Sequence, residues 1–387
     1  MHKLLYQGSE EEEEGIRANL TKAVEAVLRE LGQERLEAVV LAGSFGRGEG
    51  AVVREADSPP RPFNDIDILI VGSRPRVPCD SLARLRETLR ALAGADFADV
   101  GYMNSSDFAR ALPTVFLYEL KHGSTVLWGS ADFYRKLPPL DGKDLPLSEG
   151  TRLFLNRGIG LLSLLLMLEA GGDQNSLLRC AAAAWSKVVL AAGDSLLLQR
   201  NAYHWSYAER VERVRETMRV RDCEDGLLEK YERAALLKLT GNLSLLPAGD
   251  AEALSDDARA LHEVSFRRFE SSRTFAPLGD WCEYPVTLLR AGLAPLERRL
   301  KEFLCDRARP GRLSASDFLR FARLPLWGEE RRLALLPLLL YSPQEAESLR
   351  LSSRYLEAAS WLEHGNRKVR AGTWNRLARE VVGDSHP

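Results

Sequence analysis

The spacing of apolar residues divides the chain into an amino-terminal part with mixed periods and a longer part with helical spacing. In the first part, Ser9 followed by five glutamates indicates a helix N-terminus, and the helical spacing that follows ends at Gly32. The pattern then predicts strands at 37–42, 65–68 and 97–103, a helix at 80–92, and a helix followed by a short strand within 115–129.

Strand patterns largely vanish after the Pro- and Gly-containing stretch at 138–146, which we interpret as a linker. Helices are predicted at 148–169, 176–200, 207–220, 224–240, 250–273 and 285–305, with shorter helices between 315 and 383. We therefore predict an α+β protein with a small mixed β-sheet in its N-terminal domain and a mostly α-helical C-terminal region. The predicted domains are 1–138, 147–310 and a helical extension at 311–387.

Composition and charge place the chain among ordinary soluble globular proteins, with 45% apolar and 28% charged residues. The formal net charge of −2 gives no chain-wide basic field, so we expect no large non-specific nucleic-acid binder. Five scattered cysteines without a C-x-x-C pair favour reduced thiols over a disulfide framework or a zinc site. The N-terminus lacks a signal-peptide pattern, and the most apolar run, 159–168, is too short to cross a bilayer. We therefore expect a cytoplasmic protein without membrane association.

Two acids and a glycine-serine turn are the strongest chemical signal. Asp65 and Asp67 stand one residue apart in a predicted strand, so their side chains project to the same face. Adjacent carboxylates repel each other, and a fold keeps them together mainly when a cation lies between them. Mg²⁺ is held by one or two carboxylates together with substrate phosphates. The turn at Gly43 and Ser44 offers backbone N–H groups to phosphates, with glycine permitting close approach.

The order of these residues resembles the signature of the DNA polymerase β-type nucleotidyltransferase superfamily, G-S-x(n)-D-h-D-h with h apolar. The matching residues are Gly43, Ser44, Asp65, Ile66, Asp67 and Ile68, and the resemblance covers roughly residues 35 to 130. The interval between Ser44 and Asp65 is longer than the family's usual one. We interpret the stretch at 50–62 as a surface insertion that lengthens it.

The resemblance implies a nucleotidyltransferase fold for the N-terminal domain, dependence on Mg²⁺ with Mn²⁺ as an alternative, and a third carboxylate on a neighbouring strand. Asp99 in the predicted strand at 97–103 is the best match, and Asp96 and Glu119 are the competitors. The catalytic and metal-binding residues are then expected to be Asp65, Asp67 and Asp99. Gly43 and Ser44 would hold phosphates, Arg47 would add a cationic contact, and Glu49 would orient Arg47 without a catalytic role.

A second pattern lies in the predicted helices, where Lys187 is followed by Ser206 and Tyr207. This arrangement resembles the nucleotide grip of template-independent terminal nucleotidyltransferases. The resemblance implies that Lys187 contacts the triphosphate, Ser206 a phosphate, and Tyr207 the base, and an aromatic ring accepts any base by stacking. The alternative is structural, because Ser206 equally suits the N-cap of the helix that starts at Tyr207.

Together these features predict transfer of a nucleoside monophosphate from an NTP to an acceptor hydroxyl with release of pyrophosphate. ATP is the expected NTP, and the acceptor stays open between a small molecule, an RNA 3′ end and a protein side chain. The alternative is a non-catalytic nucleotide-binding or antitoxin-like protein that keeps the fold. The intact pair Asp65 and Asp67 favours the enzyme.

Overall fold

The computed structural model describes residues 3–54, 60–73, 77–95, 98–219, 226–281, 284, 287–288 and 336–342. The chain separates into two compact units, which we call the first unit and the second unit. The first unit comprises Met1–Pro146 and Leu196–Leu246, and the second comprises Leu147–Ser195 and Pro247–Pro387. The first unit thus includes a stretch, 196–246, that the predicted boundaries assigned to the helical domain.

A four-stranded mixed sheet forms the centre of the first unit. Its strands are β1 (Leu36–Leu41), β4 (Ile66–Gly72), β5 (Ala98–Asn104) and β6 (Thr125–Gly129). They lie in the order β5-β4-β1-β6, with β4 and β5 parallel and the two other pairs antiparallel. The small mixed sheet predicted from the sequence is confirmed, and each strand of it begins or ends within about two residues of its predicted position.

Helix α1 (Glu10–Leu31) has the predicted boundaries and a complete capping box. The Ser9 hydroxyl accepts a hydrogen bond from the Glu12 amide, and the Glu12 carboxylate accepts one from the Ser9 amide. Gly32 ends the helix at a φ of 81°. The first unit also contains α3 (Cys79–Ala93) and the short 3₁₀ helices Gln33–Arg35, Ser105–Arg110, Ala131–Lys136, Gly142–Asp144 and Leu243–Leu245.

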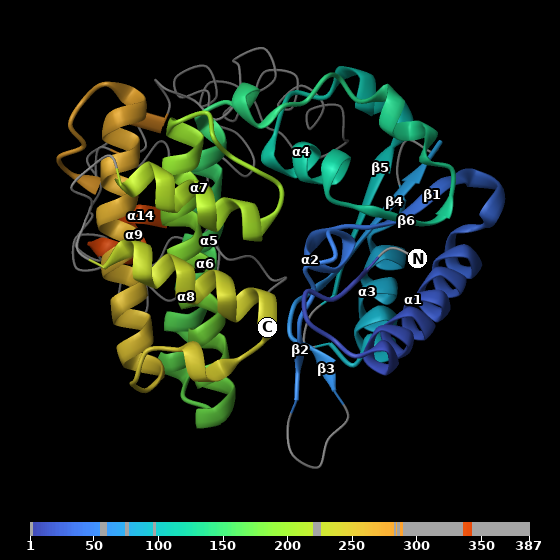
Figure 1. Cartoon of the computed structure of the whole chain (residues 1–387), viewed down its shortest axis with the longest axis horizontal. Helices are drawn as coiled ribbons and strands as arrows, with labels where there is room; N and C mark the ends of the chain where they lie inside the picture. Colours follow the sequence, from blue (N-terminus) through green and yellow to red (C-terminus); the bar gives the residue numbers. More distant parts are fainter. Residues whose placement is uncertain are drawn as a thin grey trace, which may run out of the picture. The chain divides into compact units, whose positions relative to one another are not determined.

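Helices α1 and α3 pack side by side on one face of the sheet (Figure 1). The core beneath them takes alternate residues of β4, namely Ile66, Ile68 and Ile70, all 3% exposed or less. Because successive strand residues point to opposite faces, Asp67 faces the other side of the sheet. The prediction that the two isoleucines form the core behind the acids is confirmed.

The described residues of the first unit also form the helices α2 (Gly43–Gly46), α4 (Val115–His122), α7 (Tyr207–Arg219) and α8 (Leu227–Thr240). The described helices that were predicted from the sequence here end within about three residues of the expected positions.

The interpretation of 50–62 as a surface insertion is wrong at both ends of that stretch. Residues 52–53 (β2) and 61–62 (β3) pair as a short antiparallel hairpin, and Val52 is only 3% exposed. The Asn64 side chain accepts a hydrogen bond from the Ala51 amide and donates one to the Lys238 carbonyl of α8. The apolar ends of the stretch are buried against the unit, and residues 55–59 lie outside the described residues.

The second unit is helical. It is built from α5 (Ser148–Ala170), most of α6 (Gln174–Gln199), α9 (Ala251–Thr274) and α14 (Leu336–Tyr341), with α9 and α14 packed on α5. Most of the predicted helix at 285–305 and most of the region 315–383 lie outside the described residues. The mostly helical C-terminal region is nevertheless confirmed over the described part of the chain.

Two described helices, α5 and α6, qualify as membrane spans by length and composition alone, a test that core helices of soluble proteins also meet. The run 159–168 is too short to cross a bilayer by itself, but it lies within α5, which has 23 residues. In α6, 78% of the most apolar window is buried inside the fold.

Candidate active site

The turn after β1 is shaped around the Asp67 carboxylate. Gly43 opens α2 with a φ of 62°, a conformation that favours glycine. A Cβ atom at Gly43 would lie 1.9 Å from Oδ2 of Asp67, so no larger residue fits there. The Ala42 amide donates a hydrogen bond of 2.9 Å to the Asp67 carbonyl and thereby ties the turn to β4. Strand β4, which carries Asp67, is therefore in contact with the glycine-serine turn.

The negative charge of Asp67 is poorly compensated. Burial, together with the negative charges of Asp65 and Asp99, raises the pKa of Asp67 to about 7, although the cations Lys238 and Arg47 act to lower it. Asp65 directly precedes β4, and Asp99 pairs with Asp67 across the parallel β4–β5 ladder, which places both side chains on one face. A cation bound here would remove the repulsion.

Asp99 is the outermost of these acids. Its side chain is 74% exposed and forms an ion pair with Arg86 at 3.3 Å. Among the described residues, no three His, Cys, Asp or Glu side chains gather closely enough to hold a metal ion. Asp65 and Asp67 still fit a hard divalent cation, since Mg²⁺ takes one or two carboxylates and completes its shell with substrate phosphates and water.

A pocket with a volume of about 250 Å³ opens beside Asp67. The sheet and the turn contribute one wall, and α4 contributes the other. It is lined by Ala42, Gly43, Asp67, Ile68, Leu69, Asp99, Gly101, Phe116, Glu119 and Leu120. The pocket therefore combines a carboxylate wall, backbone groups of a turn, and an apolar wall.

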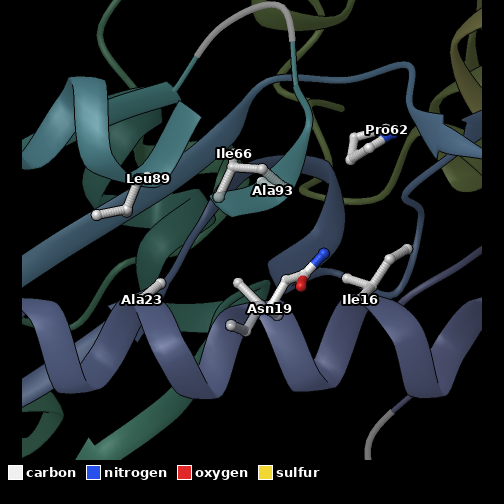
Figure 2. A pocket seen from close by; sticks show the side chains of 8 residues that line it. Ile16, Asn19, Ala23, Pro62, Ile66, Leu89 and Ala93 are labelled. Atoms are coloured by element: carbon white, nitrogen blue, oxygen red, sulfur yellow. The ribbon is translucent and has the colours of Figure 1, made fainter. Parts of the chain in front are cut away.

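A second crevice, beneath α1, differs in size and chemistry. Figure 2 shows it between α1, β4 and α3, with Asn19 as the polar side chain among apolar neighbours such as Ile16, Ile66 and Leu89. Its volume of about 10 Å³ is at the lower limit for one water molecule. It is a packing defect of the core rather than a substrate site.

Buried charges fix α4 against the turn and α7. Glu119 of α4 accepts hydrogen bonds from Arg47 at 3.0 Å, from Arg210 at 2.7 Å and from the Tyr203 hydroxyl at 2.7 Å. The side chains of Arg47 and Arg210 are 4% and 1% exposed. Burial opposes ionisation of Glu119, but the two guanidinium groups hold its pKa below the usual value.

Glu49 joins the turn to the N-terminus of α7. Its carboxylate accepts hydrogen bonds from the Ser206 hydroxyl at 2.6 Å and from the amides of Tyr207 at 3.0 Å and Ala208 at 3.3 Å. Arg47 lies 3.3 Å from the same carboxylate. A negative group at a helix N-terminus satisfies free N–H groups and favours the helix dipole. Glu49 thus caps a helix that begins more than 150 residues later in the chain.

Three cationic side chains lie over the aromatic ring of Tyr207. Its ring is in cation–π contact with Arg210 at 3.8 Å, Lys238 at 5.1 Å and Arg47 at 5.2 Å, and the residue is 7% exposed. In this arrangement the ring offers no open face for a base. The Ser206 hydroxyl also accepts a hydrogen bond from the Glu209 amide at 3.3 Å, which agrees with the capping alternative.

The structure groups most of the sequence-predicted site residues within the first unit: Gly43, Ser44, Arg47, Asp65, Asp67, Asp99, Ser206 and Tyr207. Lys187 lies on α6 in the second unit. Of the competitors for the third carboxylate, Asp96 lies outside the described residues, and Glu119 lines the pocket while paired with arginines. The catalytic and binding roles of all these sequence-predicted residues stay predictions.

Sequence reasoning missed the network partners Arg210 and Lys238 and the pocket residue Phe116. One signal was available for Arg210. It falls on the buried stripe of α7 with Tyr207, Val214 and Met218, where an arginine implies a buried anionic partner.

Comparisons with known proteins give little for this chain. No family model matches the sequence, and no curated protein matches it. Among solved structures, spectinomycin adenyltransferase from Enterococcus faecialis, with ATP and spectinomycin, is similar at 14% identity with a TM-score of 0.39. The match covers 64% of this chain and 98% of that protein.

Proposed function

We propose that this protein is a Mg²⁺-dependent nucleotidyltransferase that moves a nucleoside monophosphate from an NTP to an acceptor hydroxyl and releases pyrophosphate. One observation carries the proposal: the Asp67 carboxylate, next to Asp65, lies against the glycine turn at Gly43. A site with acids on one side and a glycine turn on the other matches a nucleoside triphosphate with its metal ion.

Asp65 and Asp67 are the residues that would hold the metal ion. When bound, Mg²⁺ activates the attacking hydroxyl and neutralises charge on the phosphates. The raised pKa of Asp67 supports this role, because a carboxyl that is unfavourable when ionised alone gains most from a cation. Asp99, on the same face of the neighbouring strand, would then act on the acceptor hydroxyl as a base or by orienting it.

The turn and α4 form the rest of the proposed site. Gly43 allows phosphates to approach the backbone amides of the turn closely. Arg47 is held by Glu49 and Glu119, so its contribution is a fixed positive charge near Asp67 rather than a mobile side chain. We expect ATP as the nucleotide and a hydroxyl of a small molecule, an RNA 3′ end or a protein as the acceptor.

The test is transfer of label from [α-³²P]ATP in the presence of Mg²⁺, with a metabolite extract, total RNA and the protein itself as acceptor pools. Wild-type protein is expected to label one pool and to release pyrophosphate. Asp67→Asn and Asp65→Asn should each lower this at least about 100-fold, as expected for loss of a metal-binding group.

Asp107→Asn is the matched control, because Asp107 is an exposed acid of the first unit on the 3₁₀ helix after β5. It should retain wild-type labelling. Equal labelling by wild type and Asp67→Asn would refute the proposal.

A non-catalytic nucleotide-binding protein is the second candidate, favoured by the ion pair between Asp99 and Arg86 and by the lack of a three-acid metal cluster among the described residues. The label-transfer experiment, combined with a titration of ATP binding in the presence of Mg²⁺, separates the two functions. Mg²⁺-dependent binding of ATP without transfer to any acceptor pool would select the binding protein. Label transfer that requires Asp67 would select the enzyme.

A further inference from the structure

Phe116 is an aromatic side chain that the fold leaves open at the pocket. Most large apolar side chains of the described residues are buried. Seven are exposed: Leu112, Phe116, Leu178, Leu236, Leu243, Val264 and Phe275. Within this set, Phe116 lines the pocket beside Asp67, and it is 49% exposed. Exposure of a phenylalanine costs free energy, so its place at a pocket with charged groups indicates a ligand contact.

Helix α4 presents this ring on a rigid support. Phe116, Glu119 and Leu120 are spaced at i, i+3 and i+4, which places them on one face of the helix, and all three line the pocket. The Thr114 hydroxyl caps the helix by accepting a hydrogen bond from the Leu117 amide at 3.1 Å. Glu119 is held in turn by Arg47 and Arg210. The position of Phe116 relative to Asp67 and Gly43 is therefore fixed by buried ion pairs.

Tyr207 is the aromatic residue that sequence patterns assign to base stacking, but its ring is covered by Arg210, Arg47 and Lys238. We propose that Phe116 is instead the surface on which the nucleobase of the NTP stacks. This inference rests on the proposed function. The nucleobase is the flat ring that the proposed reaction always supplies, whereas the acceptor need not contain one. Phosphates at the Gly43 turn would place the nucleotide in the same pocket.

The experiment compares the binding of ATP with that of inorganic tripolyphosphate, each with Mg²⁺, by titration calorimetry. Base stacking on an aromatic ring contributes enough affinity that Phe116→Ala should weaken ATP binding about 10-fold or more. The affinity for tripolyphosphate, which has no base, should not change. Phe116→Trp should bind ATP at least as well as wild type, because it keeps an aromatic face. Phe275→Ala, at a phenylalanine that is 95% exposed and far along the chain, is the control and should match wild type.

Three results would overturn the inference. Equal ATP affinity in wild type and Phe116→Ala would show that the ring does not contact the base. A parallel loss of tripolyphosphate affinity would mean that Phe116 only maintains the shape of the pocket. A raised KM for the acceptor with unchanged ATP affinity would assign the ring to the acceptor.

Failure of the proposed function gives a different pattern. If wild-type protein itself binds neither ATP nor tripolyphosphate with Mg²⁺, the nucleotide site of the proposed function is refuted and the inference falls with it, whereas ATP binding without label transfer refutes the transferase alone and leaves the role of Phe116 open to the same comparison of variants. Because that outcome is seen in wild type and the others only in the variants, the two failures are distinguishable.

Discussion

Each of the two units buries a glutamate paired with arginine, and the surroundings of the two pairs differ. In the second unit, Glu270 is 0% exposed, pairs with Arg273 at 2.7 Å, and accepts a hydrogen bond from Thr151. In the first unit, the side chain of Glu119 is 23% exposed, pairs with two arginines, and lines the pocket beside Asp67. One network is closed, and the other borders a cavity.

The difference separates a structural ion pair from a candidate site. In the closed network, the hydroxyls of Thr151 and Tyr284 both donate hydrogen bonds to the Glu270 carboxylate, in addition to its ion pair with Arg273. In the open network, cations gather around Glu119 while the nearby Asp67 has a raised pKa. An acid whose charge is not balanced by the fold is typical of a site that a ligand completes.

The largest loss of stability is expected when the Glu270 carboxylate is removed from the closed network. Glu270→Ala leaves the buried guanidinium of Arg273 without its carboxylate, which should lower the free energy of unfolding by about 3–5 kcal/mol. Denaturant unfolding followed by circular dichroism measures this. Glu252→Ala, at an exposed acid in the first turn of the same helix, should change stability by about 0.5 kcal/mol or less. An unchanged midpoint for Glu270→Ala would remove the distinction between the two networks.

A smaller loss of stability, together with a loss of binding, is expected in the open network. Glu119→Ala removes the partner of Arg47 and Arg210, and solvent near the pocket reduces the cost to about 2–3 kcal/mol. Because Glu119 fixes α4, affinity for Mg²⁺ and ATP should also fall in the folded protein at low temperature.

Glu87→Ala is the control for that variant, since Glu87 is a mostly exposed acid on α3. It should leave both stability and ATP affinity close to wild type. If Glu119→Ala lowers stability but binds ATP normally, the open network is as purely structural as the closed one.

The smallest effect concerns the pH dependence of Asp67. Its folded-state pKa of about 7 lies above the ordinary aspartate value of 3.8, so between these two pH values the folded protein holds a proton that the unfolded chain has released. Stability conferred by this proton is present below about pH 4 and is lost as the pH rises toward 7. Asp67→Asn has no such loss, so without metal its Tm should exceed that of wild type by a few degrees at pH 8 and match it near pH 4.

Added Mg²⁺ should raise the Tm of wild type at pH 8 and have little effect on Asp67→Asn. Thermal scans at pH 4, 6 and 8, with and without Mg²⁺, measure this. A wild-type Tm that does not respond to Mg²⁺ at pH 8, or that rises between pH 4 and 7 relative to Asp67→Asn, would contradict the assignment of an unbalanced acid.

Local patterns predicted the elements of this protein well. The capping box at Ser9 and Glu12, the alternation of Ile66 and Ile68 with the acids, and the spacing of the long helices are all encoded within a few residues. These features depend on neighbours in the chain, so periodicity is sufficient to find them.

Contacts between distant residues left no comparable pattern. Glu49 and Tyr207 are 158 residues apart, and Glu119 and Arg210 are 91 apart. A charged residue that is buried by a distant partner looks like a surface residue in a sequence, and Arg210 is an example. For the same reason the sequence gives no sign of the cations around the Tyr207 ring or of the exposure of Phe116 at the pocket.

The cap that Glu49 gives to α7 has a consequence for synthesis of the chain. The carboxylate leaves the ribosome well before Ser206, Tyr207 and Ala208, and the intervening residues 147–195 belong to the other unit. Folding that follows the order of translation cannot complete the first unit until the nascent chain has extended past α8. A fragment cut after Pro146 would leave Arg47, Glu49 and Glu119 without their helical partners, so we expect a shortened N-terminal domain to accumulate as aggregated protein.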